Sequence, residues 1–249
     1  MEEFKFPTET VELPSKGLVY SKDNPLSSGK VEMKYMTAKE EDILTNQNYI
    51  KDGSVIDKLL KSLIVDKSVD YDELIVGDKN AIMIAARVLG YGAEYTFKFK
   101  GEEHTVDLST LEPTPLDEVH LIQPGVNKFH FTLPNSQTKI EFKLITGKED
   151  KKIKKEIKGL QKLNKLSNPE LSTRLKHTVL SIDGNEEPKV IREFVDNHFL
   201  AVDSRAFRSH IKSFQPDIDL KFNLESSDGI VEEVSLPMTV NFFWPDAEL

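Results

Sequence analysis

One stretch of the sequence occurs twice, and this repeat restricts the folds open to the chain more than any other feature. Residues 30–42 read KVEMKYMTAKEED, and residues 139–151 read KIEFKLITGKEDK. Six of the thirteen aligned positions are identical at an offset of 109 residues (139 − 30). We therefore interpret the chain as two copies of one structural unit.

Each copy of this stretch combines a strand pattern with a helix start. Val31, Met33 and Tyr35 alternate with charged residues, which is typical of a half-buried strand. Thr37 and Glu40 then have the spacing of a capping box, in which the two side chains satisfy the first N–H groups of a helix. The second copy repeats both signals, so we predict helix N-caps at Thr37 and Thr146.

The surrounding sequence predicts the same order of elements in each copy: a strand, Leu-Pro, a loop, the repeated strand, helices and a closing hairpin. Asp78 and Asp203 are the predicted N-caps of central helices, because apolar residues follow both at the same helical spacing. The last hairpin is predicted to end in a strand that alternates through Trp244. The expected fold is α+β, with two tandem, pseudo-equivalent halves.

The stretch between the two copies has the character of a linker. Residues 112–126 contain three prolines and show no period of either a helix or a strand. We predict an N-terminal α+β unit at 1–112, a proline-containing linker at 113–126, and a C-terminal α+β unit at 127–249.

Composition excludes several functional classes. With 249 residues, 38% hydrophobic and 30% charged, the chain has the make-up of an ordinary soluble protein. It has no cysteine, which excludes disulfides, thiol catalysis and thiolate metal sites. The net charge of −9 argues against a nucleic-acid partner. No apolar run reaches membrane-spanning length, and the first residues lack the apolar region of a secretory signal, so we expect neither a membrane nor an export role.

The motifs of catalysis and cofactor binding are absent from the sequence. It has no P-loop, HExxH, EF-hand or nucleophile-elbow pattern, and its six histidines lack the spacing of metal ligands. The sequence Gly90-Tyr91-Gly92 follows a predicted helix, where a helix stop explains it better than a dinucleotide-binding turn. We therefore predict no catalytic residue, no cofactor, no metal and no small-molecule substrate.

Two short apolar segments are candidate contacts for a partner protein. The long loop between the first two strands carries Leu18 and Tyr20, and loops of this length often have a function. The alternative is that these side chains fold back onto their own core. Phe243 is predicted to face outward from the last strand, where it is either covered locally or available to a partner.

The strongest charged feature is a lysine-rich helix predicted at residues 148–166. Ile153, Ile157, Leu160 and Leu163 form its apolar stripe, with lysines on the other faces. These lysines are either a solvated outer face or a surface for an acidic partner protein. On the second interpretation, the binding residues are Lys152, Lys155 and Lys162.

Three stretches together resemble a known family. They are LPSKGLVY, TAKEEDILTNQNYIKDGSVIDKLL and ELIVGDKNAIMIAARVLGYGAEY, and the closing FFWP adds to them. With these motifs the chain resembles the T4-type phage baseplate assembly proteins. The resemblance is continuous over residues 10–110 and patchier from Phe129 to Pro245. None of its motifs is a catalytic signature.

The resemblance implies a chaperone-like assembly factor rather than an enzyme. Such a protein helps to build the central hub of a contractile-tail baseplate by binding hub proteins transiently in the host cytoplasm, and it is absent from the mature virion. The alternative is a structural baseplate or hub subunit that stays in the particle. Many relatives carry paired cysteines, resembling zinc ribbons, in two hairpins. The corresponding segments here, 95–108 and 220–236, have no cysteine, so a zinc role does not carry over. The sequence sets no oligomeric state.

Overall fold

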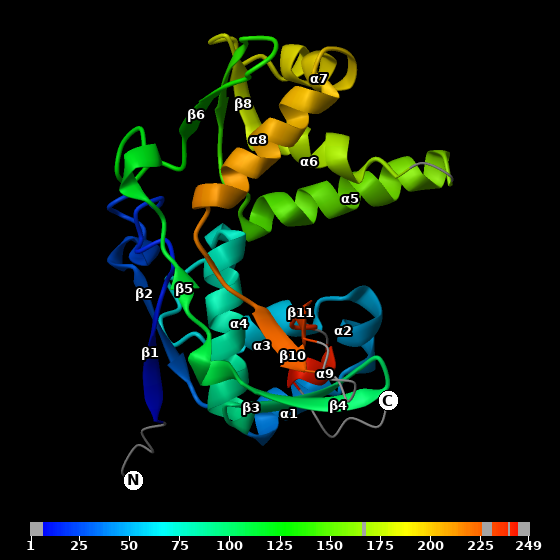
Figure 1. Cartoon of the computed structure of the whole chain (residues 1–249). Helices are drawn as coiled ribbons and strands as arrows, with labels where there is room; N and C mark the ends of the chain where they lie inside the picture. The colour runs from blue at the N-terminus through cyan, green and yellow to red at the C-terminus, as the bar shows by residue number, and fades with distance from the viewer. Residues whose placement is uncertain (1–6, 166–167, 226–230, 239, 244–249) are drawn as a thin grey trace.

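The computed structural model describes residues 7–165, 168–225, 231–238 and 240–243, and its fold is α+β as predicted (Figure 1). Within the described residues, no helix is both long and apolar enough to cross a membrane. The first half of the chain contains two hairpins with four α-helices between them. Its elements are β1 (Thr8–Glu12), β2 (Lys30–Lys34), α1 (Ala38–Leu44), α2 (Gln47–Asp52), α3 (Val55–Leu63), α4 (Val76–Tyr91), β3 (Glu94–Phe99) and β4 (Glu102–Asp107).

The second half repeats this order and also contains four α-helices, with one further strand, β8, among them. Strands β6 and β7 form an antiparallel pair, and β8 adds to the free side of β7. The elements are β6 (Phe129–Thr132), β7 (Lys139–Phe142), α5 (Gly147–Leu163), α6 (Glu170–Thr178), β8 (Val179–Ile182), α7 (Pro188–Asn197) and α8 (Ala201–Phe214). In the view of Figure 1 these elements form the upper part of the molecule, and those of the first half form the lower part.

The end of the chain returns to the first half. Strand β9 (Asp217–Ile218) pairs with β5 (Pro113–Thr114), and β10 (Lys221–Glu225) pairs with β11 (Val231–Ser235). Helix α9 (Val240–Phe243) then packs beside α4. The centroid of its Phe242 ring lies 5.0 Å from that of Tyr95 in β3. A division of the chain at 113–126 stays a prediction, but in space strand β9 and helix α9 lie against the first half (Figure 1).

A glycine in α4 allows this return. A Cβ atom built at Gly77 would lie 1.8 Å from the carbonyl oxygen of Pro216, which no real side chain could tolerate. One turn further along α4, the side-chain amide of Asn80 donates to the carboxylate of Asp217 at 2.8 Å. The first helical turn of α4 and the segment after α8 are therefore in backbone contact.

Both predicted capping boxes are confirmed. The carboxylate of Glu40 accepts from the backbone N–H of Thr37 at 3.1 Å and from its hydroxyl at 2.6 Å. Glu149 accepts from the N–H and hydroxyl of Thr146 in the same way. Each glutamate also pairs with a lysine at the end of the preceding strand. In the first half this is Lys34, the last residue of β2, and in the second half it is Lys143, the residue directly after β7. The repeated sequence thus makes the same set of contacts twice.

The predicted N-cap roles of Asp78 and Asp203 are wrong, because α4 and α8 each begin two residues earlier. Both aspartates are buried at the third helical position, and each holds the Leu-Pro turn of its own half. Asp78 accepts from the N–H of Ser15 at 2.9 Å, and Asp203 accepts from the N–H of Asn135 at 2.8 Å. Ser15 and Asn135 each directly follow Leu-Pro. We call these contacts the aspartate clamps.

Strand pairing further supports the pseudo-equivalence of the halves. The hairpins place Val11 opposite Val31 and Phe131 opposite Ile140, and the Leu-Pro turn follows in both. Ile64, directly after α3, bridges to Met33 of β2. Val179, directly after α6, pairs with Phe142 of β7 in the same register. The main difference is α7, which has no counterpart helix between Ile64 and α4.

The prediction for the last strand is wrong. Strand β11 ends at Ser235, and residues 240–243 form a helical turn instead of continuing the alternation. Trp244, the predicted end of that strand, lies outside the described residues. A helical turn brings the consecutive residues Phe242 and Phe243 into the core together, where both are fully buried, whereas a strand would direct them to opposite faces.

Removing the cap hydroxyls tests the joint between strand and helix. Thr37→Ala and Thr146→Ala should each lower the free energy of unfolding by about 0.5–2 kcal/mol, because the capping box loses its hydroxyl contact. Thermal denaturation followed by circular dichroism measures this. Thr114→Ala, at an exposed position of β5, is a matched control and should have an effect within about 0.5 kcal/mol. Unchanged melting of both cap variants would contradict the capping role.

Candidate functional site: the basic arm

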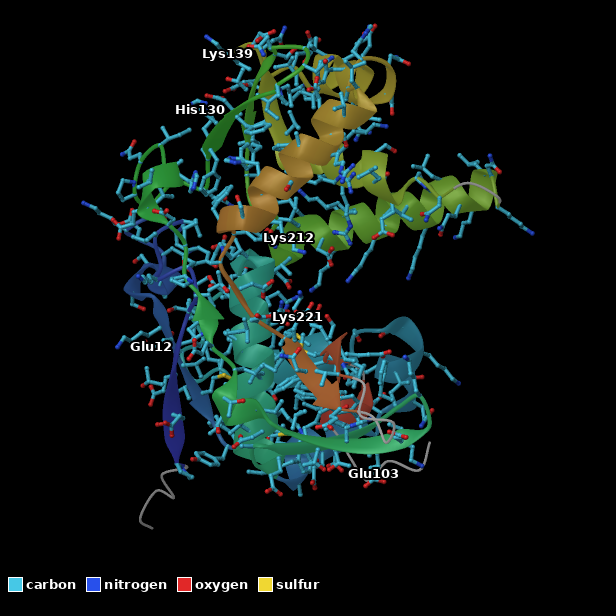
Figure 2. All side chains as sticks on the ribbon, in the orientation of Figure 1. Glu12, Glu103, His130, Lys139, Lys212 and Lys221 are labelled. Carbon is cyan, nitrogen blue, oxygen red and sulfur yellow. The ribbon has the colours of Figure 1, made fainter. Side chains whose placement is uncertain are left out.

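Helix α5 is anchored at its beginning and projects at its far end. Its buried residues are Gly147 and Ile153, whereas every residue of 158–165 is exposed. In Figure 1, α5 runs outward beyond the neighbouring helices. Figure 2 shows side chains extending from its far half into open space. We call residues 152–163 the basic arm.

Charges from the first half hold the start of α5. The Nζ atom of Lys151 lies 2.9 Å from Asp57 and 2.6 Å from Asp72. Burial would raise the pKa of Asp72, but hydrogen bonds from Lys151 and Lys61 outweigh it and hold that pKa below its usual value. The two carboxylates are therefore ionised near neutral pH, and the arm leaves the body in a fixed direction.

Helices α6 and α7 hold the middle of α5 through Glu156. Its carboxylate lies 2.9 Å from Nε2 of His177 and 2.9 Å from a guanidinium nitrogen of Arg192. The hydrogen bond from Arg192, followed by that from His177, lowers the pKa of Glu156 to about 2. Nearer the start of α5, Asp150 pairs with Arg174 of α6 at 3.1 Å. Beyond Glu156, the lysines of α5 form no ion pair with another described residue.

The arm itself presents lysines together with bare leucines. Lys152, Lys155, Lys158 and Lys162 are exposed and form no ion pair with another described residue. Leu163 is 87% exposed and Leu160 is 36% exposed. The predicted apolar stripe therefore exists, but of its members only Ile153 is buried. A surface that combines open leucines with unpaired cations is chemically suited to an acidic protein partner.

The structure places the predicted partner-binding residues in different settings. Lys152, Lys155 and Lys162 lie together on the basic arm, as the helical spacing predicts. Leu18 is half-buried against the hydrophobic core. Tyr20 and Phe243 are buried, so neither presents a free surface. The alternative for the loop, in which its side chains fold back onto the core, holds for Tyr20.

Tyr20 belongs to the first aspartate clamp. Its hydroxyl donates to Asp78 at 2.6 Å and accepts the N–H of Ile75 at 3.0 Å. Burial, with the neighbouring Asp78 carboxylate as the next cause, raises the pKa of Tyr20 above its usual range. The long loop therefore has a structural role: it places the Tyr20 hydroxyl in hydrogen-bond contact with the start of α4. The sequence signal was the Leu-Pro-Ser turn, whose partner Asp78 lies too far along the chain to be recognised.

The described residues include no group of three or more His, Asp or Glu side chains placed to hold a metal ion. A cavity of about 190 Å³ lies between the two halves and is lined mainly by apolar side chains and backbone. Its charged members are Lys143, Arg174 and Asp217.

Comparisons with known proteins add no relative: no protein-family model, no curated protein and no solved structure matches the chain.

The Glu156 anchor predicts a pH dependence of stability. Because folding lowers the pKa of Glu156 from 4.5 to about 2, its contribution is fully present above pH 4.5 and is lost as the pH falls towards 2. Glu156→Gln should therefore lower the melting temperature at pH 7 by roughly 1–4 °C. It should also flatten the decline in stability between pH 5 and about pH 2.

Thermal melts across this pH range check the prediction. Glu193→Gln on α7 is the control, because Glu193 is exposed and forms no ion pair with another described residue. Parallel pH profiles of the wild type and Glu156→Gln would show that the anchor has no effect.

Proposed function

We propose that this protein is a non-enzymatic assembly factor that promotes formation of the central hub of a phage tail baseplate. It acts by transient protein–protein binding in the host cytoplasm and leaves before the virion is complete. The observation that carries the proposal is the basic arm, whose distal lysines and leucines face solvent. The resemblance to the T4-type baseplate assembly proteins supplies the identity of the partners, which are the hub proteins.

The arm has the features of a helix that binds in a groove. Leu160 and Leu163 are one turn apart, so both can enter one apolar groove. The lysines beside them would meet acidic side chains at the rim of that groove. A rim of this kind accelerates encounter and selects the partner more than it adds affinity. Such binding is suited to a factor that must release its partner after assembly.

The charge distribution disfavours a nucleic-acid partner. The whole chain carries a net charge of −9, so the arm is a local basic feature on an acidic protein. A backbone-phosphate surface needs many cations over a broad face, whereas here they lie along one exposed helix. An acidic protein surface requires only a local match.

The runner-up function is a structural hub subunit that stays in the particle. The same arm would serve it, because geometry alone does not distinguish a transient contact from a permanent one. What separates the two is the fate of the chain after assembly.

Reversal of the arm charges tests the binding surface. Lys152→Glu, Lys155→Glu and Lys162→Glu combined should abolish co-purification with the hub protein that the chain binds, because an acidic groove would then repel the arm. The melting temperature should change little, since these lysines make no ion pair with another described residue. Co-expression with each hub protein in turn, followed by affinity purification, measures the loss.

The control has the same change in charge at another place. The combined variant Lys22→Glu, Lys139→Glu and Lys189→Glu reverses three exposed lysines that lie outside the basic arm. Lys139 is on the β6–β7 hairpin, away from α5 (Figure 2). This variant should bind normally. Equal binding by both triple variants would count against the arm.

The leucine at the tip provides a separate test. Leu163→Ser removes exposed apolar surface, so the free energy of unfolding should stay within about 0.5 kcal/mol of the wild type. Partner affinity should fall about tenfold, as expected when a leucine that becomes buried on binding is removed. Calorimetric titration against the purified partner gives both the affinity and the stoichiometry. An unchanged affinity would limit the arm to an electrostatic role.

The fate of the chain distinguishes the two functions. Quantitative mass spectrometry of purified virions should detect no stoichiometric amount of this protein, while infected-cell lysates should contain its complex with a hub protein. A stoichiometric copy number in virions would replace the assembly factor with the structural subunit.

A further inference from the structure

The two halves of the molecule contact each other through two short backbone segments. The segment from the first half and the segment from the second half occupy different places in the repeated unit. In the second half, residues 145–147 form the joint between β7 and α5. In the first half, residues 74–76 lead into α4. The N–H of Val76 donates to the carbonyl of Ile145 at 3.2 Å, and the N–H of Gly147 donates to the carbonyl of Leu74 at 2.9 Å. A β-bridge between Ile75 and Thr146 lies between these two bonds.

Each of these segments has a pseudo-equivalent in the other half. The offset of 109 residues that aligns the capping boxes relates 145–147 to 36–38, which join β2 to α1. The offset of 125 that aligns the aspartate clamps (203 − 78) relates 74–76 to 199–201, which lead into α8. The contact between the halves therefore uses the joint of one unit and the helix lead of the other. This leaves one joint and one helix lead unused.

In the unused segments the same backbone groups have no hydrogen-bond partner within the part of the chain that the structure describes, and Ala38 and Ala201 are exposed. Among the described residues, no hydrogen bond is made by the N–H of Ala38, the carbonyl of Met36, the N–H of Ala201 or the carbonyl of Phe199. Ala38 and Ala201 are the first residues of α1 and α8, so no bond within the helix uses their N–H groups. Leu200 is 45% exposed. Its equivalent Ile75, which bridges to Thr146 in the joint of the second half, is only 2% exposed.

The side chains around the unused pair are also compatible with contact. In the occupied interface Lys151 of the joint meets Asp57 and Asp72. The position equivalent to Lys151 is Asp42. Those equivalent to Asp57 and Asp72 are Ser172 and Asn197, by the offsets that align α3 with α6 and α4 with α8. An aspartate opposite a hydroxyl and an amide meets hydrogen-bond donors and no like charge.

The unused joint and the unused helix lead lie at opposite ends of the molecule. Helix α1 is at the lower end in Figure 1, while the start of α8, beside α7, is at the upper end. A single chain cannot bring them together, but two chains can. A contact between two different surfaces of identical chains is heterologous and propagates from copy to copy.

We propose that copies of this protein associate head to tail, with residues 36–38 of one copy binding residues 199–201 of the next. The occupant of each surface is a second copy, because the same chain already contains this contact once, between its own halves. The two backbone hydrogen bonds would run from Ala38 N–H to the Phe199 carbonyl and from Ala201 N–H to the Met36 carbonyl. This inference does not depend on the proposed assembly function.

One substitution makes the contact between chains weaker than the contact within a chain. Gly77 allows the carbonyl of Pro216 to lie against α4, but its equivalent in α8 is Val202, which is 57% exposed. The valine side chain prevents a similar approach by the segment after α4. The intermolecular contact is therefore confined to the joint and the helix lead, and the association is concentration-dependent.

Proline at the first position of a helix removes an N–H group and leaves the helix intact. Ala38→Pro removes the donor of the joint, and Ala201→Pro removes the donor of the helix lead. The preceding residue Thr37 is extended, and Leu200 has a ψ of 143°, so neither is in the helical conformation that a following proline disfavours. Gln47→Pro, at the exposed first position of α2, is the matched control because Asn46 before it is also extended.

Sedimentation velocity of the full chain over a hundredfold range of concentration tests the proposal. The wild type and Gln47→Pro should show a weight-average mass that rises with concentration. Ala38→Pro and Ala201→Pro should each raise the dissociation constant about tenfold or more, because a backbone carbonyl loses its donor. Circular dichroism melts equal to those of Gln47→Pro confirm that both variants are folded.

Mixing the two variants gives the decisive result. Ala38→Pro keeps an intact helix lead and Ala201→Pro keeps an intact joint, so an equimolar mixture should form a dimer that does not grow further. A symmetric dimer would not be restored in this way. The proposal is overturned if the wild type is monomeric at every concentration. It is equally overturned if both variants associate like the wild type, or if the mixture behaves like its separate components.

Discussion

The fold depends on a buried carboxylate at the third position of a central helix. In the first half, Asp78 receives hydrogen bonds from Ser15 and Tyr20 and so fixes the hairpin on α4. Burial raises the pKa of Asp78, whereas at Asp203 the backbone N–H groups of Asn135 and Ser136 outweigh burial and lower the pKa. The same device thus operates under different electrostatic conditions in the two halves. Loss of either carboxylate would leave buried donors without an acceptor, which is costly in a protein interior.

Local signals in the sequence predicted the elements and missed the contacts between distant residues. The capping boxes at Thr37 and Thr146 depend on residues three apart, so their spacing alone was sufficient. Asp78 looked like an N-cap because aspartate is favoured at that position, but its true partners lie 58 and 63 residues earlier. The final helical turn was predicted as strand because Phe242 fits an alternating pattern. Its packing against Tyr95 decides the conformation, and no local pattern records that contact.

The candidate site was predicted in part for the same reason. Helical spacing grouped Lys152, Lys155 and Lys162, and it also identified the apolar stripe that ends at Leu163. Spacing cannot show how far a helix extends beyond its neighbours, so the exposure of the leucines came only from the structure. Tyr20 lies on a long loop and Phe243 on a predicted last strand, and both positions suggested an exposed side chain. In the fold both side chains are buried in the hydrophobic core.

The return of the chain to its first half has a consequence for folding during synthesis. Tyr95 and Phe242 are 147 residues apart (242 − 95), and their packing closes the lower core. The N-terminal half leaves the ribosome long before residues 217–243 exist, so its apolar surface around α4 and β3 stays open during that interval. Contacts of such long sequence separation form slowly, because the intervening loop must first be ordered. Until translation supplies the last helix, the nascent first half therefore exposes apolar surface that the finished protein buries.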